Sequence, residues 1–252
     1  MVSIVSPTLF LKKAFAKANF SRAVIALSGG VDSATSCALA VAALGKENIY
    51  PLLLPYGNMN TQGTKDARLV VQALKIPDEK VAEINIQPFV DPIFPLDPTM
   101  DNVRRGNIMA RVRMTIIFDQ AKKRNALVVG TENKTEHLLG YFTRFGDEAS
   151  DIEPLRNLYK TQVYELAKQL GIPQPILTKA PTAGLWEGQT DEGEFGFTYK
   201  EADEILSLLV DEKKSIKEVV SAGFQQAIAQ KIYDRMTAND FKHNLPVVPD
   251  SK

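Results

Sequence analysis

Short apolar runs alternate with helical patterns through the first half of the chain. Residues 23–27 form a nearly continuous apolar run, which is typical of a strand buried on both faces of a parallel sheet. Comparable runs occur at 49–54, 81–86 and 126–129, and helical patterns lie between them at 32–44, 61–75 and 107–124. This alternation predicts an α/β fold, a doubly wound, Rossmann-like parallel sheet flanked by helices.

The helical stretch at 107–124 carries apolar residues at a four-residue spacing. Ile108, Val112 and Ile116 share one helical face, which we expect to dock against the sheet. Arg111 and Arg113 point elsewhere on the same helix. Together with Arg104 and Arg105 they form a basic cluster, which is either a solvated helix face or an anion site.

The last third of the chain has a different character. Residues 161–170 are helical, 174–197 are rich in glycine, proline and acidic residues, and three helical patterns follow from Tyr199 onward. We therefore expect a C-terminal helical segment within one domain that spans residues 1–252. The stretch at about 178–198 is too long for an ordinary connection, so it is either disordered or a functional lid.

Composition narrows the possible partners. The 252 residues balance 30 Lys and Arg against 30 Asp and Glu, which argues against nucleic acid as a partner and favours a small anionic ligand. No stretch approaches the roughly 20 apolar residues of a membrane span. The first eleven positions lack the features of a secretory signal, and the lone Cys37 has no internal disulfide partner. These observations predict a protein of the cytoplasm with no membrane partner.

A glycine-rich turn follows the first predicted strand. It reads Ser28-Gly29-Gly30-Val31-Asp32-Ser33, and adjacent glycines allow backbone N–H groups to face a phosphate at the start of the next helix. No Gly-Lys-Ser/Thr follows, so this is not a Walker P-loop. Asp32 instead places a carboxylate beside the phosphates, which suits Mg²⁺. The alternative is a plain strand-to-helix turn in which Asp32 or Ser33 caps the helix.

This loop resembles that of the PP-loop ATP pyrophosphatases, which grip the pyrophosphate that leaves when ATP adenylates an acceptor. The resemblance implies the half-reaction but leaves the acceptor open. Further segments are similar to NAD⁺ synthetases over nearly the whole chain. They are 54–57, 106–107 with 110–114, 130–136, and above all 181–192, which holds the sole tryptophan and the core Gly-Gln-Thr-Asp-Glu.

The resemblance implies a set of site residues. ATP would be bound by Ser28, Gly29, Gly30, Val31, Asp32, Ser33, Thr131, Lys160 and Thr182, and Mg²⁺ by Asp32 and Glu136. The acceptor deamido-NAD⁺ would be contacted by Arg111, Arg144, Asp151 and Lys242, with Asp151 and Lys160 as the catalytic residues.

The chain departs from the family pattern in three places. The family often has lysine at the position of Arg144, a His-Lys-Arg triplet at Phe241-Lys242-His243, and in some relatives an aromatic at Val103. These departures concern the dinucleotide contacts of the C-terminal segment and the recognition of the pyridine ring.

The reaction implied is the ATP-dependent amidation of deamido-NAD⁺ through an acyl-adenylate. A glutamine amidohydrolase needs a catalytic cysteine, and Cys37 lies in an apolar helix where a packed thiol is expected, so ammonia is the predicted nitrogen donor. The resemblance also implies a homodimer. The alternatives are a PP-loop tRNA-modifying thiolase and a nucleotide-binding module that has lost catalysis.

Overall fold

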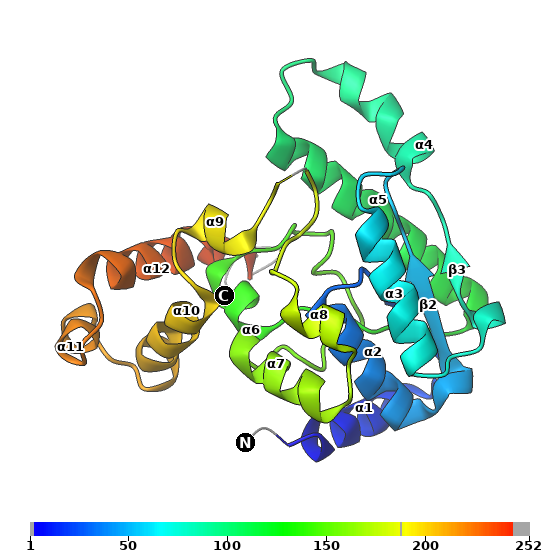
Figure 1. Cartoon of the computed structure of the whole chain (residues 1–252), viewed down its shortest axis with the longest axis horizontal. Coiled ribbons are helices and arrows are strands. Elements are labelled where there is room, and N and C mark those ends of the chain that lie inside the picture. Colours follow the sequence, from blue (N-terminus) through cyan, green and yellow to red (C-terminus); the bar gives the residue numbers. More distant parts are fainter. Residues whose placement is uncertain (1–2, 187, 244–252) are drawn as a thin grey trace, which may run out of the picture.

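Four parallel strands form the centre of the fold. The computed structural model describes residues 3–186 and 188–243, so Glu187 of the tryptophan-containing motif lies outside the described residues. The strands are β1 (Ala23–Ala26), β2 (Ile49–Leu53), β3 (Ala82–Glu83) and β4 (Leu127–Val128), in the order β3-β2-β1-β4. Helices cover both faces of the sheet (Figure 1), which confirms the predicted α/β class.

The strand order reverses at β1. The chain moves outward from β1 to β2 and β3, and then returns to place β4 on the other side of β1. In parallel α/β sheets such a reversal leaves a crevice at the carboxyl ends of the two strands that flank it. The segments after β1 and after β4 therefore meet at one edge of the sheet, and these are the glycine turn and residues 131–136.

Five helices pack on one face of the sheet. They are α1 (Val5–Ala18), α2 (Val31–Leu44), α3 (Thr61–Ala73), α7 (Lys160–Gln169) and α8 (Gln174–Thr178). Ala23 and Ile25 of β1 enter this core, because alternate side chains of a strand point to opposite faces. Gly45 ends α2 with a positive φ of 83°, a conformation that glycine adopts without strain.

The other face is covered by α4 (Gln87–Val90) and α5 (Asn102–Arg124), which bury Val24 and Leu52 of the sheet. The predicted start of α5 at residue 107 was wrong, because the helix begins five residues earlier, at Asn102. Asp101 caps it there by accepting the N–H of Arg104 at 2.8 Å. Met109, Ile117 and Ala121 of this helix are buried against the sheet, while Ile108, Val112 and Ile116 pack half-buried beside them.

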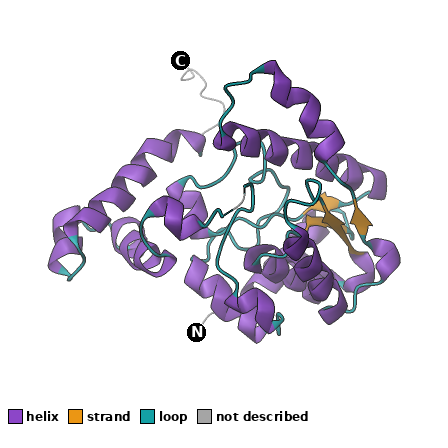
Figure 2. Cartoon of the chain, turned by 45° about the horizontal axis from the view of Figure 1, so that its top comes forward, coloured by secondary structure: helices purple, strands orange, loops and turns teal. Residues whose placement is uncertain are grey.

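A second lobe follows the sheet. In Figure 1 it extends away from the strands, and Figure 2 shows the strands and this lobe at opposite ends of the molecule. The lobe confirms the predicted C-terminal helical segment, and its core joins α6 to the later helices. Its elements are α6 (Lys134–Leu139), α9 (Asp191–Phe195), α10 (Tyr199–Leu206), a π-helical turn η4 (Ser207–Asp211), α11 (Ile216–Ser221) and α12 (Gln226–Asn239).

Short 3₁₀ turns complete the chain. These are η1 (Lys46–Asn48), η2 (Asp78–Lys80), η3 (Asp91–Leu96) and η5 (Asp240–Lys242). Of the predicted strand at 81–86, only Ala82 and Glu83 form a regular strand, at the edge of the sheet. Ile84 and Ile86 still donate their N–H groups to the carbonyls of Leu53 and Pro55, at 2.9 and 2.8 Å. In residues 3–186 and 188–243, no helix is both long and apolar enough to cross a bilayer.

Candidate active site

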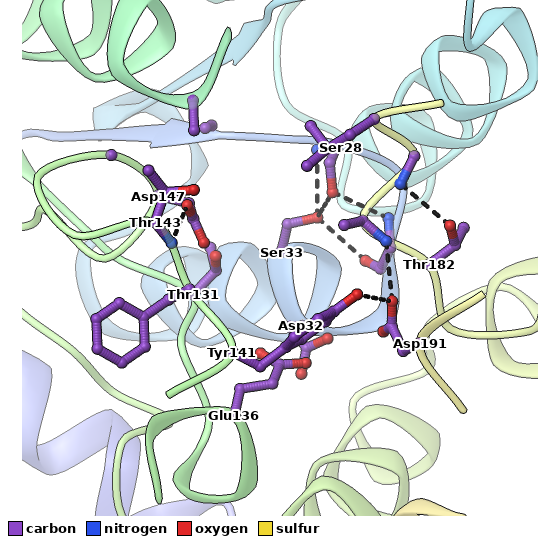
Figure 3. A pocket seen from close by; sticks show the side chains of 18 of the residues that line it. Ser28, Asp32, Ser33, Thr131, Glu136, Tyr141, Thr143, Asp147, Thr182 and Asp191 are labelled. Carbon is purple, nitrogen blue, oxygen red and sulfur yellow. Dashed lines mark hydrogen bonds between the residues drawn. The ribbon is translucent and has the colours of Figure 1, made fainter. Parts of the chain in front are cut away.

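A cavity of about 730 Å³ opens at the carboxyl ends of the strands. It lies between the sheet and the segment 179–194, which reaches across it from the side of α8. Figure 3 shows Thr131, Thr143 and Asp147 on one side of it and Thr182 and Asp191 on the other. The predicted site residues that line it are Ser28, Gly30, Val31, Asp32, Ser33, Thr131, Glu136, Lys160, Thr182 and Lys242.

The glycine turn after β1 has a geometry that requires glycine at position 29. Gly29 has φ +82°, and a Cβ there would lie 2.3 Å from the carbonyl oxygen of Gly63 on α3. Gly29 therefore packs against α3 and does not line the cavity. Its close approach holds the turn in place, and it leaves Ser28 and Gly30 to face the open space.

The serines of the turn are already hydrogen-bonded to it. Ser33 Oγ donates to the carbonyl of Gly30 at 3.1 Å, and Ser28 Oγ accepts the N–H of Gly30 at 3.3 Å. Helix α2 begins directly after, at Val31, with its positive N-terminal end towards the cavity. Backbone N–H groups and a helix N-terminus around a rigid turn form a site suited to a phosphate.

Lys160 joins the two predicted metal ligands. Its Nζ lies 2.6 Å from Oδ2 of Asp32 and 2.8 Å from Oε1 of Glu136. Asp32 belongs to α2 and Glu136 to α6, so the cluster bridges the segments that follow β1 and β4. The Lys160 side chain is 3% exposed, whereas the two carboxylates remain accessible from the cavity at 18% and 17%.

Burial and charge act on this cluster in opposite directions. Burial alone would lower the pKa of Lys160, but the carboxylates of Asp32 and Glu136 raise it above its usual value, so the ammonium stays charged. The pKa of Glu136 is raised to about 7, first by burial and then by the negative charge of Asp32, against the attraction of Lys160. Glu136 therefore takes up a proton more readily than an ordinary glutamate.

Asn133 links the carboxylate of Asp32 to the backbone at Glu136, a role that was not predicted from the sequence. Its Oδ1 accepts the N–H of Glu136 at 2.9 Å as the N-cap of α6, and its Nδ2 donates to Oδ1 of Asp32 at 2.9 Å. An asparagine just before a helical pattern is a typical N-cap, so the capping role of Asn133 could have been predicted from the sequence. The partner Asp32, 101 positions away, could not have been.

The donor set of this cluster fits a magnesium ion. Asp32 and Glu136 direct one oxygen each at a single cationic atom, the ammonium of Lys160, so their lone pairs converge on one point. Mg²⁺ is commonly held by one or two carboxylates together with substrate phosphates and water. Within 3–186 and 188–243, no cluster of three or more His, Cys, Asp or Glu side chains forms a metal cage. The arrangement therefore suits an ion that arrives with a polyphosphate.

Over its described residues, the segment 178–198 is folded and held by hydrogen bonds within itself. Asp191 is buried and accepts the backbone N–H of Ala183 at 3.1 Å, while Thr182 Oγ1 donates to the carbonyl of Gln189 at 2.7 Å. The side-chain oxygen of Gln189 accepts the N–H of Leu185 at 2.8 Å. These internal bonds shape the segment into a compact strap over the cavity.

Contacts at both ends hold this strap to the body of the protein. Lys179 pairs with the buried Asp66 of α3 at 2.9 Å. Leu185 packs on Gly106 of α5, where an added Cβ would lie 2.7 Å from the leucine Cδ1. The glycine at 106 thus forms a notch for the tip of the strap.

A second carboxylate, Asp147, lies in the cavity wall and was not among the predicted site residues. Its Oδ1 accepts the N–H of Thr143 at 2.9 Å, and the Thr143 hydroxyl donates to Asn107 at 2.8 Å. Asp147 is an exposed residue of the cavity wall, and desolvation by the surrounding protein raises its pKa. Desolvation also lowers the pKa of the neighbouring Arg113 to about 10, against the charge of Asp147.

Three residues predicted to contact the dinucleotide lie outside the lining of this cavity. Arg111 donates through Nε and Nη2 to the carbonyl of Arg144, at 3.3 and 3.2 Å, so these two are brought together. Asp151 Oδ2 accepts the N–H of Val128 at 2.7 Å and lines a shallower cavity with Phe10, Glu153 and Arg156. The predicted residues are thus divided between the main cavity and a neighbouring face.

Two further residues that were assigned from the sequence are Lys242 and Cys37. Lys242 lines the main cavity, but its ammonium donates to the carbonyls of Gly140 and Phe142 at 2.6 and 3.1 Å. Cys37 is fully buried in α2, and burial raises the pKa of its thiol to about 12. A buried, protonated thiol is inert as a nucleophile, in line with the predicted packing role.

Comparison with known proteins gives a consistent result. The profile of a family described as NAD synthase matches residues 3–246. A relative from Trichlorobacter lovleyi, named NH3-dependent NAD⁺ synthetase, is 46% identical over 239 residues, which cover 95% of this chain and 86% of the relative.

Two solved structures are similar over the whole chain. The structure of an NMN synthetase from Francisella tularensis superposes with a TM-score of 0.85 at 36% identity and full coverage of both chains. An NH3-dependent NAD synthetase from Campylobacter jejuni, solved with a nitrate ion, has a TM-score of 0.81 at 29% identity and covers 98% of this chain and 97% of its own.

Proposed function

The chain belongs to the NAD synthase family, and on that basis we propose that it makes NAD⁺ from deamido-NAD⁺, with ATP and ammonia as co-substrates. The observation that supports this most directly is the meeting of the glycine turn with Asp32, Glu136 and Lys160 at the switch point of the sheet. A phosphate cradle beside a convergent carboxylate pair suits ATP bound with a divalent cation.

The first step is adenylation. An oxygen of the nicotinate carboxylate attacks the α-phosphorus of ATP, a new P–O bond forms, and the bond to the β-phosphate breaks to release pyrophosphate. The turn at 28–33 would hold the leaving phosphates through its N–H groups and the N-terminus of α2. Thr131 and Thr182 line the same cavity from opposite sides and would complete the ATP site.

Charge at the leaving pyrophosphate must be offset. Mg²⁺ held by Asp32 and Glu136 would supply electrostatic stabilisation there when bound. Lys160 carries a permanent charge beside both carboxylates, and its long side chain can turn from them to the phosphates. We therefore place Lys160 in the adenylation step as a catalytic residue.

The second step is amide formation. The lone pair of ammonia attacks the acyl carbon, the C–O bond to the phosphate breaks to release AMP, and the nitrogen loses a proton. Ammonia is mostly ammonium near neutral pH, so a carboxylate open to the cavity is a suitable place to hold it. Asp147 meets this requirement, since it faces the cavity and its raised pKa favours accepting a proton.

An acyl-adenylate must be protected from water until ammonia arrives. We propose that the strap at 178–198 acts as the lid that closes the cavity. Its support is the set of contacts made by Asp191, Lys179 and Leu185, which hold it across the opening. If Thr182→Ala kept full turnover, the lid would have no catalytic role.

Arg111, Arg144, Asp151 and Lys242 stay our candidates for contacts with the dinucleotide. Two guanidinium groups near each other suit one pyrophosphate, and they lie beside the cavity rather than in it. An acceptor longer than the cavity would extend to that face.

We also propose that the enzyme is a homodimer of the cytoplasm. Helix α1 exposes Val5, Leu9 and Phe10 at 71%, 46% and 47%, an apolar strip that a second copy would cover. The cytoplasm is where ATP and the dinucleotides are available. Sedimentation of the purified protein would give the subunit number, and a monomer at all concentrations would overturn the homodimer.

One assay tests the reaction as a whole. AMP release would be followed with deamido-NAD⁺ or xanthosine monophosphate as acceptor, and with ammonium or glutamine as nitrogen donor. We expect AMP only with deamido-NAD⁺, and NAD⁺ only when ammonium is added. Turnover with glutamine alone, or none with any acceptor, would overturn the proposal.

Isotope labelling tests the intermediate. With ¹⁸O in the nicotinate carboxylate, the adenylate path carries one ¹⁸O into the phosphate of AMP. Release of unlabelled AMP would exclude that path while leaving the overall reaction intact. Asp147→Asn should raise the KM for ammonium and leave exchange of pyrophosphate into ATP unchanged, because the exchange needs adenylation alone.

The likeness to the Francisella tularensis structure supports a second candidate within the same chemistry. That protein is named NMN synthetase and matches this chain over its full length. The corresponding substrate here would be nicotinate mononucleotide, which carries the same carboxylate without the second nucleotide. A ratio of kcat/KM for the two acceptors decides between them, and we expect deamido-NAD⁺ to be preferred.

A further inference from the structure

One hydroxyl group lies between two carboxylates at the edge of the cavity. Tyr199 begins α10 and is buried, with its oxygen 2.9 Å from Oδ2 of Asp191 and 3.1 Å from Oε1 of Glu136. A tyrosine hydroxyl has one proton, and ionised carboxylates have none to donate. The hydroxyl can therefore donate to one of the two carboxylates at a time.

The two carboxylates belong to different parts of the machinery. Asp191 anchors the strap: it accepts the N–H of Ala183 and, at 3.1 Å, the hydroxyl of Tyr141. Glu136 faces the convergence point that it shares with Asp32. Tyr199 thus connects the anchor of the proposed lid to the carboxylate pair proposed for the cation.

We propose that Tyr199 is a positioning residue that couples closure of the strap to occupation of the cation position. When a divalent cation draws electron density from Glu136, this carboxylate becomes a weaker acceptor than it is beside the singly charged ammonium of Lys160. The Tyr199 hydroxyl then donates to Asp191 and strengthens the anchor. This inference rests on the proposed function, because it assumes both the lid and the metal.

Without the divalent cation, the same proton is shared with Glu136. The hydrogen bond from the Tyr199 hydroxyl to Asp191 is then weaker, and the strap is held less firmly. The hydroxyl keeps its proton throughout, since only its direction changes. Coupling through one proton is reciprocal, so closure of the strap must also raise the affinity for the cation by the same factor.

The chain contains its own reporter of the strap. Trp186 is the single tryptophan, lies in the strap and lines the cavity. Its fluorescence should change when the strap closes over a ligand. The probe is an ATP analogue with a methylene group between the α- and β-phosphates, which binds but does not react.

Tyr141→Phe is the matched control for Tyr199→Phe. Both variants remove one hydroxyl donated to Asp191, but only the Tyr199 hydroxyl also reaches the Glu136 carboxylate. Tyr141 meets Glu136 through its backbone N–H, which donates to the Glu136 carbonyl at 2.9 Å and is kept in Tyr141→Phe. Fluorescence titrations at pH 8 give the affinity for the analogue with and without Mg²⁺. The ratio of the two affinities is the factor by which the ion tightens closure. Near-ultraviolet circular dichroism and melting temperature check that each variant is folded.

We expect Mg²⁺ to tighten binding of the analogue in the unaltered protein. The factor by which it does so, measured from the fluorescence of the strap, should fall about tenfold in Tyr199→Phe. Tyr141→Phe should weaken closure equally with and without Mg²⁺ and keep the factor. Asp191→Asn, which weakens the same hydrogen bond from the other side, should reproduce the loss.

An unchanged Mg²⁺ factor in Tyr199→Phe would overturn the inference and leave the proposed function standing. An equal loss in Tyr141→Phe would also overturn it, because the effect would then belong to the anchor in general. Formation of NAD⁺ by the unaltered protein is measured in parallel. Its absence would mark failure of the proposed function itself.

Discussion

Two ion clusters, each of two carboxylates and one cation, take one glutamate each from the same short stretch of chain, 131–136. In the first, Asp32 and Glu136 share Lys160. In the second, Glu132 and Glu153 share Arg156, whose Nη2 lies 2.5 Å from Oε2 of Glu132 and 3.8 Å from Oε1 of Glu153. The two glutamates of 131–136 lie four positions apart, and burial raises the pKa of each.

The clusters differ in their cation and in their exposure. Lys160 is a point charge on a flexible chain, and its carboxylates are open to the cavity. Arg156 is a planar group that binds carboxylates in a fixed geometry, and the Glu132 side chain is 4% exposed. We therefore predict that the ammonium of Lys160, among accessible carboxylates, can be exchanged for another cation, whereas the guanidinium of Arg156, beside a buried carboxylate, has a structural role.

The largest expected effect is on turnover. Asp32→Asn removes a charge from the first cluster, and we expect release of AMP to fall by at least about a hundredfold while the fold is kept. Glu132→Gln is the matching acid-to-amide substitution in the second cluster and should alter kcat by less than about threefold. Equal losses in the two variants would remove the functional distinction between the clusters.

The next effect is on stability and its rescue. Lys160→Met leaves two carboxylates without their cation, which should cost about 3–5 kcal/mol of the free energy of unfolding. Mg²⁺ can bind between the two carboxylates in place of the lost ammonium, so it should raise the melting temperature of this variant more than that of the unaltered protein. Arg156→Met should lose comparable stability and gain nothing from Mg²⁺. Equal shifts in both variants would contradict an exchangeable first cluster.

The pH dependence of stability sharpens the contrast. Burial raises the pKa of Glu132 from 4.5 to about 8, so between these values the folded state holds a proton that the unfolded chain has released. Stability from this group is complete below pH 4.5 and is lost as the pH rises to about 8, by about 2–4 kcal/mol. Urea unfolding at pH 5 and pH 8 measures it. Glu132→Gln mimics the protonated form and should flatten the slope, whereas a parallel slope would contradict the assignment.

The smallest effect concerns the residue that orients the first cluster. Asn133→Ser keeps an oxygen that can cap α6 but loses the amide that donates to Asp32. We expect a loss of about 1 kcal/mol in the free energy of unfolding and a few-fold weaker dependence on Mg²⁺. Chemical denaturation and a Mg²⁺ titration of turnover would measure the two. A Mg²⁺ requirement identical to that of the unaltered protein would show that Asp32 is oriented by other groups.

Local patterns in the sequence predicted much of the fold and part of the candidate site. The apolar runs predicted the strands, the adjacent glycines predicted a phosphate turn, and the tryptophan-containing motif carried the family resemblance. These features are readable because they depend on neighbours in sequence: side-chain periodicity, the freedom of glycine at positive φ, and the missing donors of a helix N-terminus. Element ends were less certain, since the true start of α5 depended on a single cap at Asp101.

The tertiary structure alone decided which charges meet. Lys160 and Asp32 are 128 positions apart, Asn133 and Asp32 101 apart, and Tyr199 and Glu136 63 apart. Nothing in local periodicity relates these positions. They come together because the strand order reverses at β1, which places the ends of β1 and β4 side by side, and because the C-terminal helices pack against α6. The same packing divided two glutamates of one short segment between an open cluster and a buried one.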